Sequence, residues 1–365
     1  MSIEKEVSEM HTQPNNGKDS LPVRSPFYYL SEYRTELMGI AILWVVLFHS
    51  DLSFAFIHNS FIHRAMMRFS NIGYGGVDIF LLLSGMGVYV SLDKNDISTF
   101  IRNRIRRIIP VWWLYLLICI ILGFFVSGIR YTGLEIIGFL TFTGYWLDMA
   151  NQGSWYVYAI MLFYLISPVL HSLLKHSGNR TRTCIGLLIV SLMMAASFLT
   201  DSRLIVFSRL PIFIIGMYIS SALRNISIDK KQWILILTAF VFGNVLLLVS
   251  VRYFHDYLWP YGLWWYPFIL IAPSLSLLLA KCFDMSDKYV RPLCRLFSVF
   301  GRSSLEILLI SNYFFDHFVD PAGEWFSEET AIILVSMVAV VLGIAFHYGV
   351  EIIKKKFSFS SLSSK

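Results

Sequence analysis

The chain is poor in charge: only 15% of its 365 residues are charged, while 56% are hydrophobic and the mean hydropathy is +0.63. A soluble domain carries about a quarter charged residues, so this deficit excludes an ordinary soluble protein. The hydrophobic residues gather in runs of the roughly 20 residues that cross the hydrocarbon core of a bilayer. These runs lack the alternation of membrane barrel strands. The composition therefore predicts an all-α integral membrane protein, whose helices satisfy their own backbone hydrogen bonds.

Several missing motifs narrow the function. The four cysteines form no C-x-x-C pair, which argues against a disulfide framework or a zinc site. No Gly-rich phosphate loop and no H-E-x-x-H motif occurs, so nucleotide hydrolysis and metalloprotease chemistry have no support. We expect no metal and no nucleic-acid partner. Residues 1–33 are polar and lack the apolar core of a signal peptide, which predicts a disordered tail.

Apolar runs predict about ten transmembrane helices. They cover residues 37–57, 72–92, 109–128, 154–174, 183–200, 205–223, 232–251, 258–280, 296–315 and 330–353. A further apolar run, 134–147, is too short for a span and is predicted to be re-entrant or interfacial. We therefore expect a disordered cytoplasmic tail over 1–33, a polytopic transmembrane domain over 34–353 and a second cytoplasmic tail over 354–365.

Loop charges predict the orientation of these spans. The loop 93–108 carries five basic residues, and other basic clusters follow the fourth, sixth, eighth and tenth spans. The loop 316–329 has five acidic residues and no Lys or Arg. With both termini in the cytoplasm, every basic cluster falls inside and the acidic loop falls outside, as the positive-inside rule requires. Counting 134–147 as a span would invert everything after it and place most basic loops outside.

Charged or titratable side chains inside predicted spans are costly and mark functional sites, and four of them stand out: His49, Asp78, Arg209 and Glu306. His49 and Asp78 lie about 12 Å and about 9 Å below the outer ends of consecutive antiparallel spans. We therefore expect them to share one depth and to meet. A carboxylate beside an imidazole raises its basicity and favours general-base catalysis, whereas the structural alternative is a polar pair that joins two helices.

Other candidates have two readings each. Arg209 would hold an anionic or hydroxyl-rich ligand, or extend to the interface. Glu306 would line a polar path or pair with a polar group of another helix. Trp155, at the start of a span, fits an aromatic belt and is a candidate substrate contact. Arg104 and Arg107 would either set the topology or bind the phosphates of a cofactor such as coenzyme A.

Six segments carry motifs that occur together in one family. They are 36–49, which ends in a Phe-His pair, 76–85 (G-V-D-I-F-L-L-L-S-G), 100–113 with Arg104 and Arg107, 155–168, 209–216 and 301–306. Taken in order, they resemble acyltransferase family 3, whose members are integral-membrane acyltransferases. The resemblance covers nearly every span from 34 to 353.

The chain departs from the family pattern at three places. Met38 occupies the position of an Arg that usually lies eleven residues before the His, and Arg34, one turn earlier, would take its place. Ile160 replaces the acidic residue of the fourth motif. Ser311-Asn312 stands where the terminal helix often carries a His. These departures indicate a divergent member.

The resemblance implies acyl transfer, usually of acetyl, from acetyl-CoA or another acyl-CoA to a hydroxyl of a cell-surface polysaccharide or glycolipid sugar. It implies a multi-pass protein of the plasma or inner membrane of a bacterium. In this scheme His49 is the general base or a transient acyl carrier and Asp78 orients it. Arg104 and Arg107 hold coenzyme A, while Arg209, Glu306 and Trp155 contact the substrate.

Two other classes fit parts of the sequence. A transporter or flippase for a glycan or small anion has the same composition, but such proteins commonly show repeat symmetry and paired broken helices, and the sequence shows neither. A receptor or scaffold would explain the acidic loop but not the polar residues at matched depth.

Overall fold

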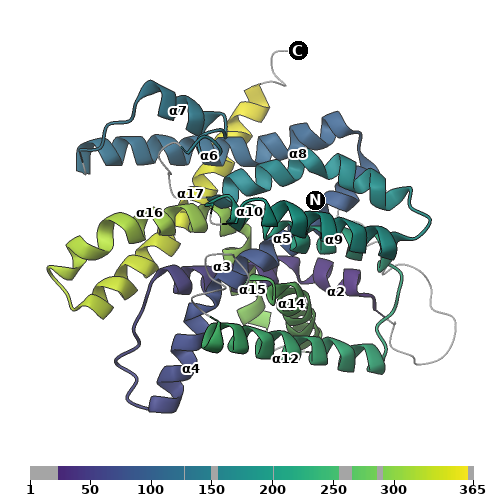
Figure 1. Cartoon of the computed structure of the whole chain (residues 1–365). Helices are drawn as coiled ribbons and strands as arrows, with labels where there is room; N and C mark the ends of the chain where they lie inside the picture. Colours follow the sequence, from purple (N-terminus) through teal and green to yellow (C-terminus); the bar gives the residue numbers. More distant parts are fainter. Residues whose placement is uncertain are drawn as a thin grey trace. The chain divides into compact units, whose positions relative to one another are not determined.

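A computed structural model of the chain describes residues 24–126, 128–148, 155–199, 201–254, 265–285 and 291–360. Within these ranges the chain forms helices and no strand, which confirms the all-α prediction (Figure 1). Contacts divide it into two compact units that interleave in sequence. Unit 1 contains Met1–Met38, Asp78–Lys94 and Ile166–Ser298, and unit 2 contains Gly39–Val77, Asn95–Leu165 and Val299–Lys365. The predicted transmembrane domain over 34–353 stays a prediction.

Six helices of the described ranges are long and apolar enough to cross a membrane. They are Gly73–Lys94, Ile97–Phe125, Trp155–Lys175, Leu204–Ala222, Lys230–Tyr253 and Glu328–Lys356. The other predicted spans fall on helices that are shorter or more polar, and one of them, 258–280, begins outside the described residues. The multi-pass membrane architecture follows from the six helices, while the total of ten spans stays a prediction.

Unit 1 is built mainly from seven named helices of the described residues. They are α2 (Pro26–Glu32), α5 (Gly76–Lys94), α9 (Arg180–Ala196), α10 (Leu204–Phe207), α11 (Leu210–Ala222), α12 (Lys230–Tyr253) and α14 (Phe268–Asp284). The Oγ atom of Ser25 caps α2, and Phe27, Tyr29 and Leu30 are buried. The predicted disorder is therefore wrong for residues 24–33, and residues 1–23 lie outside the described ranges.

Helices α5 and α11 approach closely because each presents a glycine to the other. A Cβ atom on Gly85 would overlap the carbonyl oxygen of Phe213, and one on Gly216 would overlap that of Leu82. Along both helices the pair of Asp78 and Arg209 comes first, the glycine contacts follow, and the bond from Ser220 Oγ to the carbonyl of Met86 comes last, so the two run parallel. Small residues are the usual means by which membrane helices pack this tightly.

Two further pairs of helices in unit 1 are antiparallel, α9 with α11 and α12 with α14. In the first, the start of α9 meets the end of α11, where Arg180 donates to the carbonyl of Ser221 and the hydroxyls of Thr181 and Tyr218 lie 2.9 Å apart. In the second, α12 packs on α14 at Gly243, where a Cβ atom would lie 2.8 Å from Cγ1 of Ile271. Figure 1 shows α12 and α14 side by side.

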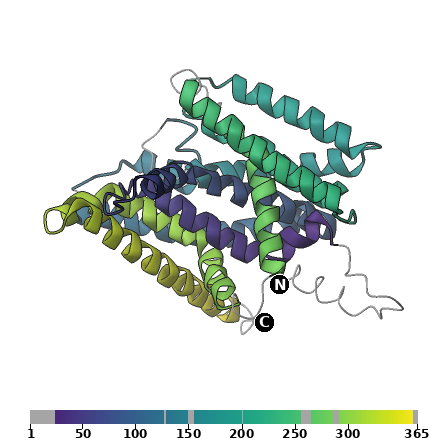
Figure 2. The same cartoon turned by 90° about the horizontal axis from the view of Figure 1, so that it is seen from below.

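Unit 2 contains most of the other helices. They are α3 (Arg34–His49), α4 (Ser60–Asn71), the 3₁₀ helix η1 (Gly73–Gly75), α6 (Ile97–Val126), α7 (Gly133–Leu140), the first half of α8 (Trp155–Lys175), α16 (Ser304–Gly323) and α17 (Glu328–Ser360). The rest of α8, from Ile166, and most of α15 (Arg291–Arg302) belong to unit 1. Helices α16 and α17 form a hairpin that lies side by side in both views (Figure 2). A Cβ atom on Gly343 would lie 2.6 Å from Cα of Ile307, so this hairpin is also closely packed.

Several predicted boundaries are wrong. Helix α3 ends at His49 rather than at residue 57, and the amphipathic helix α4 follows after a loop that holds Asp51 and Phe54 at positive φ. Helix α6 begins at Ile97, so the basic run 102–107 lies on a helix and not in a loop. Helix α16 runs to Gly323 and takes in the first half of the predicted loop 316–329.

The apolar run 134–147 does not form a long helix. Its helix, α7, has eight residues and is about 12 Å long, which is too short to cross a bilayer. It starts in a capping box in which Thr132 and Glu135 bond each other's backbone N–H groups. The prediction that this run is not an ordinary span is confirmed.

Candidate active site

His49 is the last residue of α3 and belongs to unit 2. The predicted depth, eight residues inside a span, is wrong because the helix ends there. The residue as a whole is exposed, and its ring meets Phe48 edge to face with centroids 5.1 Å apart. The surrounding protein partly desolvates the imidazole, and the carboxylates of Asp316 and Asp51 are close enough to act on it electrostatically. The site thus supplies an imidazole with acidic neighbours.

Asp316 connects His49 to a polar cluster on α6 and α16. Tyr115 of α6 interacts with Asp316 and Tyr313, and its hydroxyl forms a hydrogen bond with Cys119. His317 stacks on Tyr313 at 4.2 Å between centroids. The sequence analysis missed Asp316 as a site residue because it assigned this position to an outer loop.

Asp78 and Arg209 form a buried ion pair within unit 1. Their exposed fractions are 2% and 1%, and Arg209 donates a hydrogen bond from Nη1 to Oδ2 of Asp78. The guanidinium of Arg209 also lies over Trp265, 5.2 Å from the ring centroid. Extension of Arg209 to the interface is therefore excluded by its burial. The expected pairing of Asp78 with His49, a unit 2 residue, stays a prediction.

Glu306 pairs with a histidine of the neighbouring helix in unit 2. Nδ1 of His347, on α17, lies 3.0 Å from Oε1 of Glu306, on α16, and Glu306 is buried. One of the two readings of Glu306, a pairing with a polar group of another helix, is confirmed. The sequence analysis overlooked His347, although it lies inside the predicted span 330–353.

A second histidine was also overlooked. His171 of α8 is buried in unit 1, where its Nε2 atom lies 3.3 Å from Oδ1 of Asp93 and its ring lies 4.7 Å from that of Tyr89. No group of three or more His, Cys, Asp or Glu that could hold a metal ion occurs in the described part of the chain.

The two arginines predicted to bind coenzyme A differ in their surroundings. Arg104 packs against aromatic rings, with its guanidinium 5.1 Å from the centroid of Phe100 and 5.2 Å from that of Tyr164. Arg107 is exposed on the same helix, as are Arg102 and Arg106. Only the exposed arginines present their guanidinium groups to a ligand, and Arg104 joins α6 to α8.

The two remaining candidates lie at helix starts. Trp155 opens α8, is half-buried and meets Tyr156 edge to face at 6.3 Å. Arg34, which was expected to replace the family Arg at Met38, packs against α5. A Cβ atom on Gly87 would lie 2.8 Å from Nη1 of Arg34.

A family model described as an acyltransferase domain matches residues 37–348, which is most of the chain. The chain belongs to acyltransferase family 3. This confirms the predicted family. The matched range includes His49 and Asp78 and ends just after His347, whereas Arg34 precedes it. No curated protein and no solved structure matches the chain. The family and the six apolar helices together make this protein a multi-pass membrane acyltransferase.

Proposed function

We propose that this acyltransferase moves an acetyl group from acetyl-CoA to a hydroxyl of a cell-surface polysaccharide or glycolipid sugar. Family membership supports the acyl-transfer chemistry. The distribution of basic loops supports ten spans with both termini in the cytoplasm of a bacterial cell. In that orientation the basic start of α6 faces the cytoplasmic pool of acetyl-CoA. The end of α3 that carries His49 faces outward.

The observation that carries the proposal is the position of His49, at the end of α3, with Asp316 in electrostatic reach of its imidazole. His49 takes the proton of the sugar hydroxyl while the oxygen attacks the thioester carbonyl carbon. The C–S bond then breaks, and the leaving thiolate of coenzyme A receives a proton. Asp316 stabilises the imidazolium that forms in between, which is the usual task of a carboxylate next to a catalytic histidine.

The two buried polar pairs take structural roles in this proposal. Asp78 holds α5 against α11 through Arg209, and Glu306 holds α16 against α17 through His347. Arg107 binds the phosphates of coenzyme A, because it is exposed and Arg makes bidentate contacts with phosphate. Trp155 offers an aromatic ring for stacking on a sugar.

The test measures incorporation of labelled acetyl into surface glycan by membranes that contain the full chain. We expect His49→Ala to reduce the rate by about 10²–10⁴, the usual effect of losing a positioned base. His58→Ala is the matched control, since His58 is exposed in the nearby loop. Near wild-type incorporation by His49→Ala would contradict the proposal. Movement of glycan across reconstituted vesicles without incorporation would instead indicate a transporter.

A further inference from the structure

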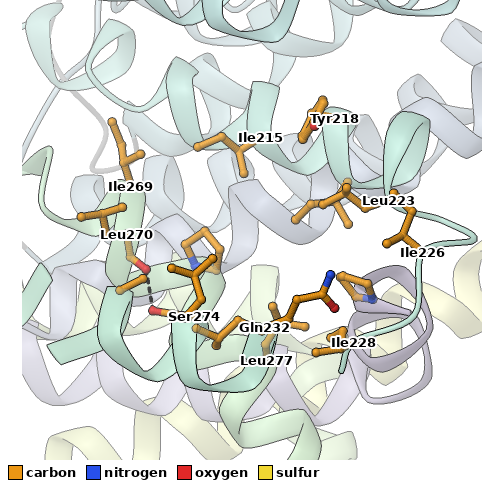
Figure 3. A pocket seen from close by; sticks show the side chains of 16 residues that line it. Ile215, Tyr218, Leu223, Ile226, Ile228, Gln232, Ile269, Leu270, Ser274 and Leu277 are labelled. Carbon is orange, nitrogen blue, oxygen red and sulfur yellow. Dashed lines mark hydrogen bonds between the residues drawn. The ribbon is translucent and has the colours of Figure 1, made fainter. Parts of the chain in front are cut away.

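Unit 1 contains a cavity of about 400 Å³ between α2, α11, α12 and α14. Its volume lies within the range of small-molecule sites, roughly 300–1,000 Å³. Figure 3 shows side chains of α11, such as Ile215 and Tyr218, on one side, with Gln232 of α12 and Leu277 of α14 on the other. All of the residues that line the cavity belong to unit 1.

The lining is almost wholly hydrocarbon, and most of its few polar groups already have partners. Ser274 Oγ donates to the carbonyl oxygens of Leu270 and Ile271, at 2.5 Å and 3.1 Å, and the first bond is drawn in Figure 3. Tyr218 bonds Thr181, and Oε1 of Gln232 accepts from the N–H of Asp229. An occupant therefore gains little from polar atoms inside the cavity, and an alkyl chain suits it best.

The cavity is open toward the outside of unit 1. Four α12 residues line it at positions 232, 235, 236 and 239, which is the spacing of one helical face. Two lining residues, Leu235 and Ile226, are exposed by 67% and 47%. Since α12 is one of the six candidate spans, a lipid chain can enter from the bilayer at this side.

Basic residues surround one end of the cavity. Arg224 lies between the lining residues Leu223 and Ile226, and the exposed Lys230 and Lys231 directly precede Gln232. Arg180 is attached to the end of α11 through the carbonyl of Ser221. Asp229, which caps α12, is the acidic residue of this segment. This end therefore carries a positive charge that complements an anionic headgroup.

We propose that this cavity binds one acyl chain of an anionic phospholipid, with the lipid phosphate among Arg224, Lys230 and Lys231. Basic pockets between membrane helices typically bind anionic headgroups in this way. The lipid would fasten α2 and α12 to α11 and α14, which makes it a structural ligand separate from the acyl-transfer site in unit 2.

The experiment uses the full chain in nanodiscs with phosphatidylglycerol that carries a photoreactive group near the end of one acyl chain. Labelled peptides are identified by mass spectrometry. We expect labels on α11, α12 and α14. Labelling should fall roughly tenfold in Ala239→Trp, which corresponds to about 1.4 kcal/mol of binding free energy. Val241→Trp is the control, since Val241 is exposed on the opposite face of α12. Leu235→Trp replaces Ala239→Trp if that variant does not fold.

A second arm tests the headgroup. The double variant Lys230→Gln/Lys231→Gln should lose the preference for phosphatidylglycerol over an equally photoreactive phosphatidylcholine. Arg252→Gln, at the other end of the same helix, should retain the preference. Unchanged labelling in the tryptophan variants, equal labelling by both lipids in the wild type, or displacement of the label by a long-chain acyl-CoA would each overturn the proposal.

Discussion

Arg209 reaches Asp78 from a position seven residues before Gly216, and Asp78 itself stands seven residues before Gly85. Seven residues are close to two helical turns, so on each helix the charged residue and the glycine share one face. The ion pair and the glycine contacts together form one interface between the parallel helices α5 and α11. This geometry gives a physical reason for the G-V-D…S-G and R-L-P…G segments to occur in the same chain.

The first prediction concerns the ion pair itself. Asp78→Asn leaves a buried guanidinium without its counter-charge and should lower the free energy of unfolding by about 3–5 kcal/mol. Arg209→Gln should cost less, because a carboxyl can take up a proton whereas Arg stays charged. The double variant Asp78→Asn/Arg209→Gln should be more stable than Asp78→Asn alone. Thermal unfolding in detergent checks all three, and additive losses would contradict the pairing.

The same double variant separates two roles of Asp78. If Asp78 only joins α5 to α11, a folded double variant retains acyl transfer. If Asp78 orients His49, as the sequence analysis expects, the double variant folds but loses activity. Parallel measurement of unfolding temperature and labelled acetyl incorporation distinguishes these results.

The second prediction concerns the glycines of this interface. Gly85→Ala and Gly216→Ala each place a methyl group against a backbone carbonyl, so each should destabilise the protein by about 1–3 kcal/mol. Gly186→Ala is the control, because a Cβ atom at Gly186 of α9 meets nothing within 4 Å. The control should be neutral or stabilised by up to about 1 kcal/mol through helix propensity. Equal behaviour of the three variants would refute the close approach.

The third prediction concerns the pair in the α16–α17 hairpin. Glu306→Gln and His347→Ala should each lower stability by about 0.6–1.7 kcal/mol, the range measured for polar contacts between membrane helices. Glu351→Gln, which loses a partly exposed pair with Lys354 on its own helix, should change stability by less than about 0.5 kcal/mol. Thermal unfolding of the three variants provides the comparison.

The fourth prediction separates the two arginines of α6. Arg107→Gln should raise the KM for acetyl-CoA by roughly 10–100-fold, because a charge-assisted hydrogen bond contributes about 1.5–3 kcal/mol. Arg104→Gln should instead lower stability by about 0.5–2 kcal/mol through loss of its aromatic contacts. Steady-state kinetics with kcat and KM resolved checks the first effect, with Arg64→Gln on α4 as the exposed control. An unchanged KM in Arg107→Gln would remove Arg107 from the binding site.

The rarity of charges in apolar runs was a good guide to individual residues and a poor one to their partners. It selected Asp78, Arg209 and Glu306, all of which are buried and in contact with a polar partner. The pairing of Asp78 with Arg209 joins positions 131 residues apart, which local sequence cannot indicate. Applied to histidines as well, the same argument would have found His347 and His171.

Helix ends were the least predictable part of the fold. Hydrophobic residues continue to Ile57, but α3 stops at His49, and the left-handed backbone of Asp51 lies just beyond it. Helix α4 was missed because its basic residues, such as Arg64 and Arg68, interrupt the apolar run. Conversely, Asp316 looked like a loop residue because it is charged, although the backbone of α16 continues to Gly323.

The interleaved order of the two units has a consequence for synthesis. The ribosome completes Asp78 131 residues before it reaches Arg209, and everything from Asn95 to Leu165 in between belongs to unit 2. At about 5–20 residues per second, the nascent chain carries this carboxyl without its arginine for roughly 7–26 s. Either the carboxyl is protonated during that delay, or the insertion machinery shields α5 from lipid until α11 emerges.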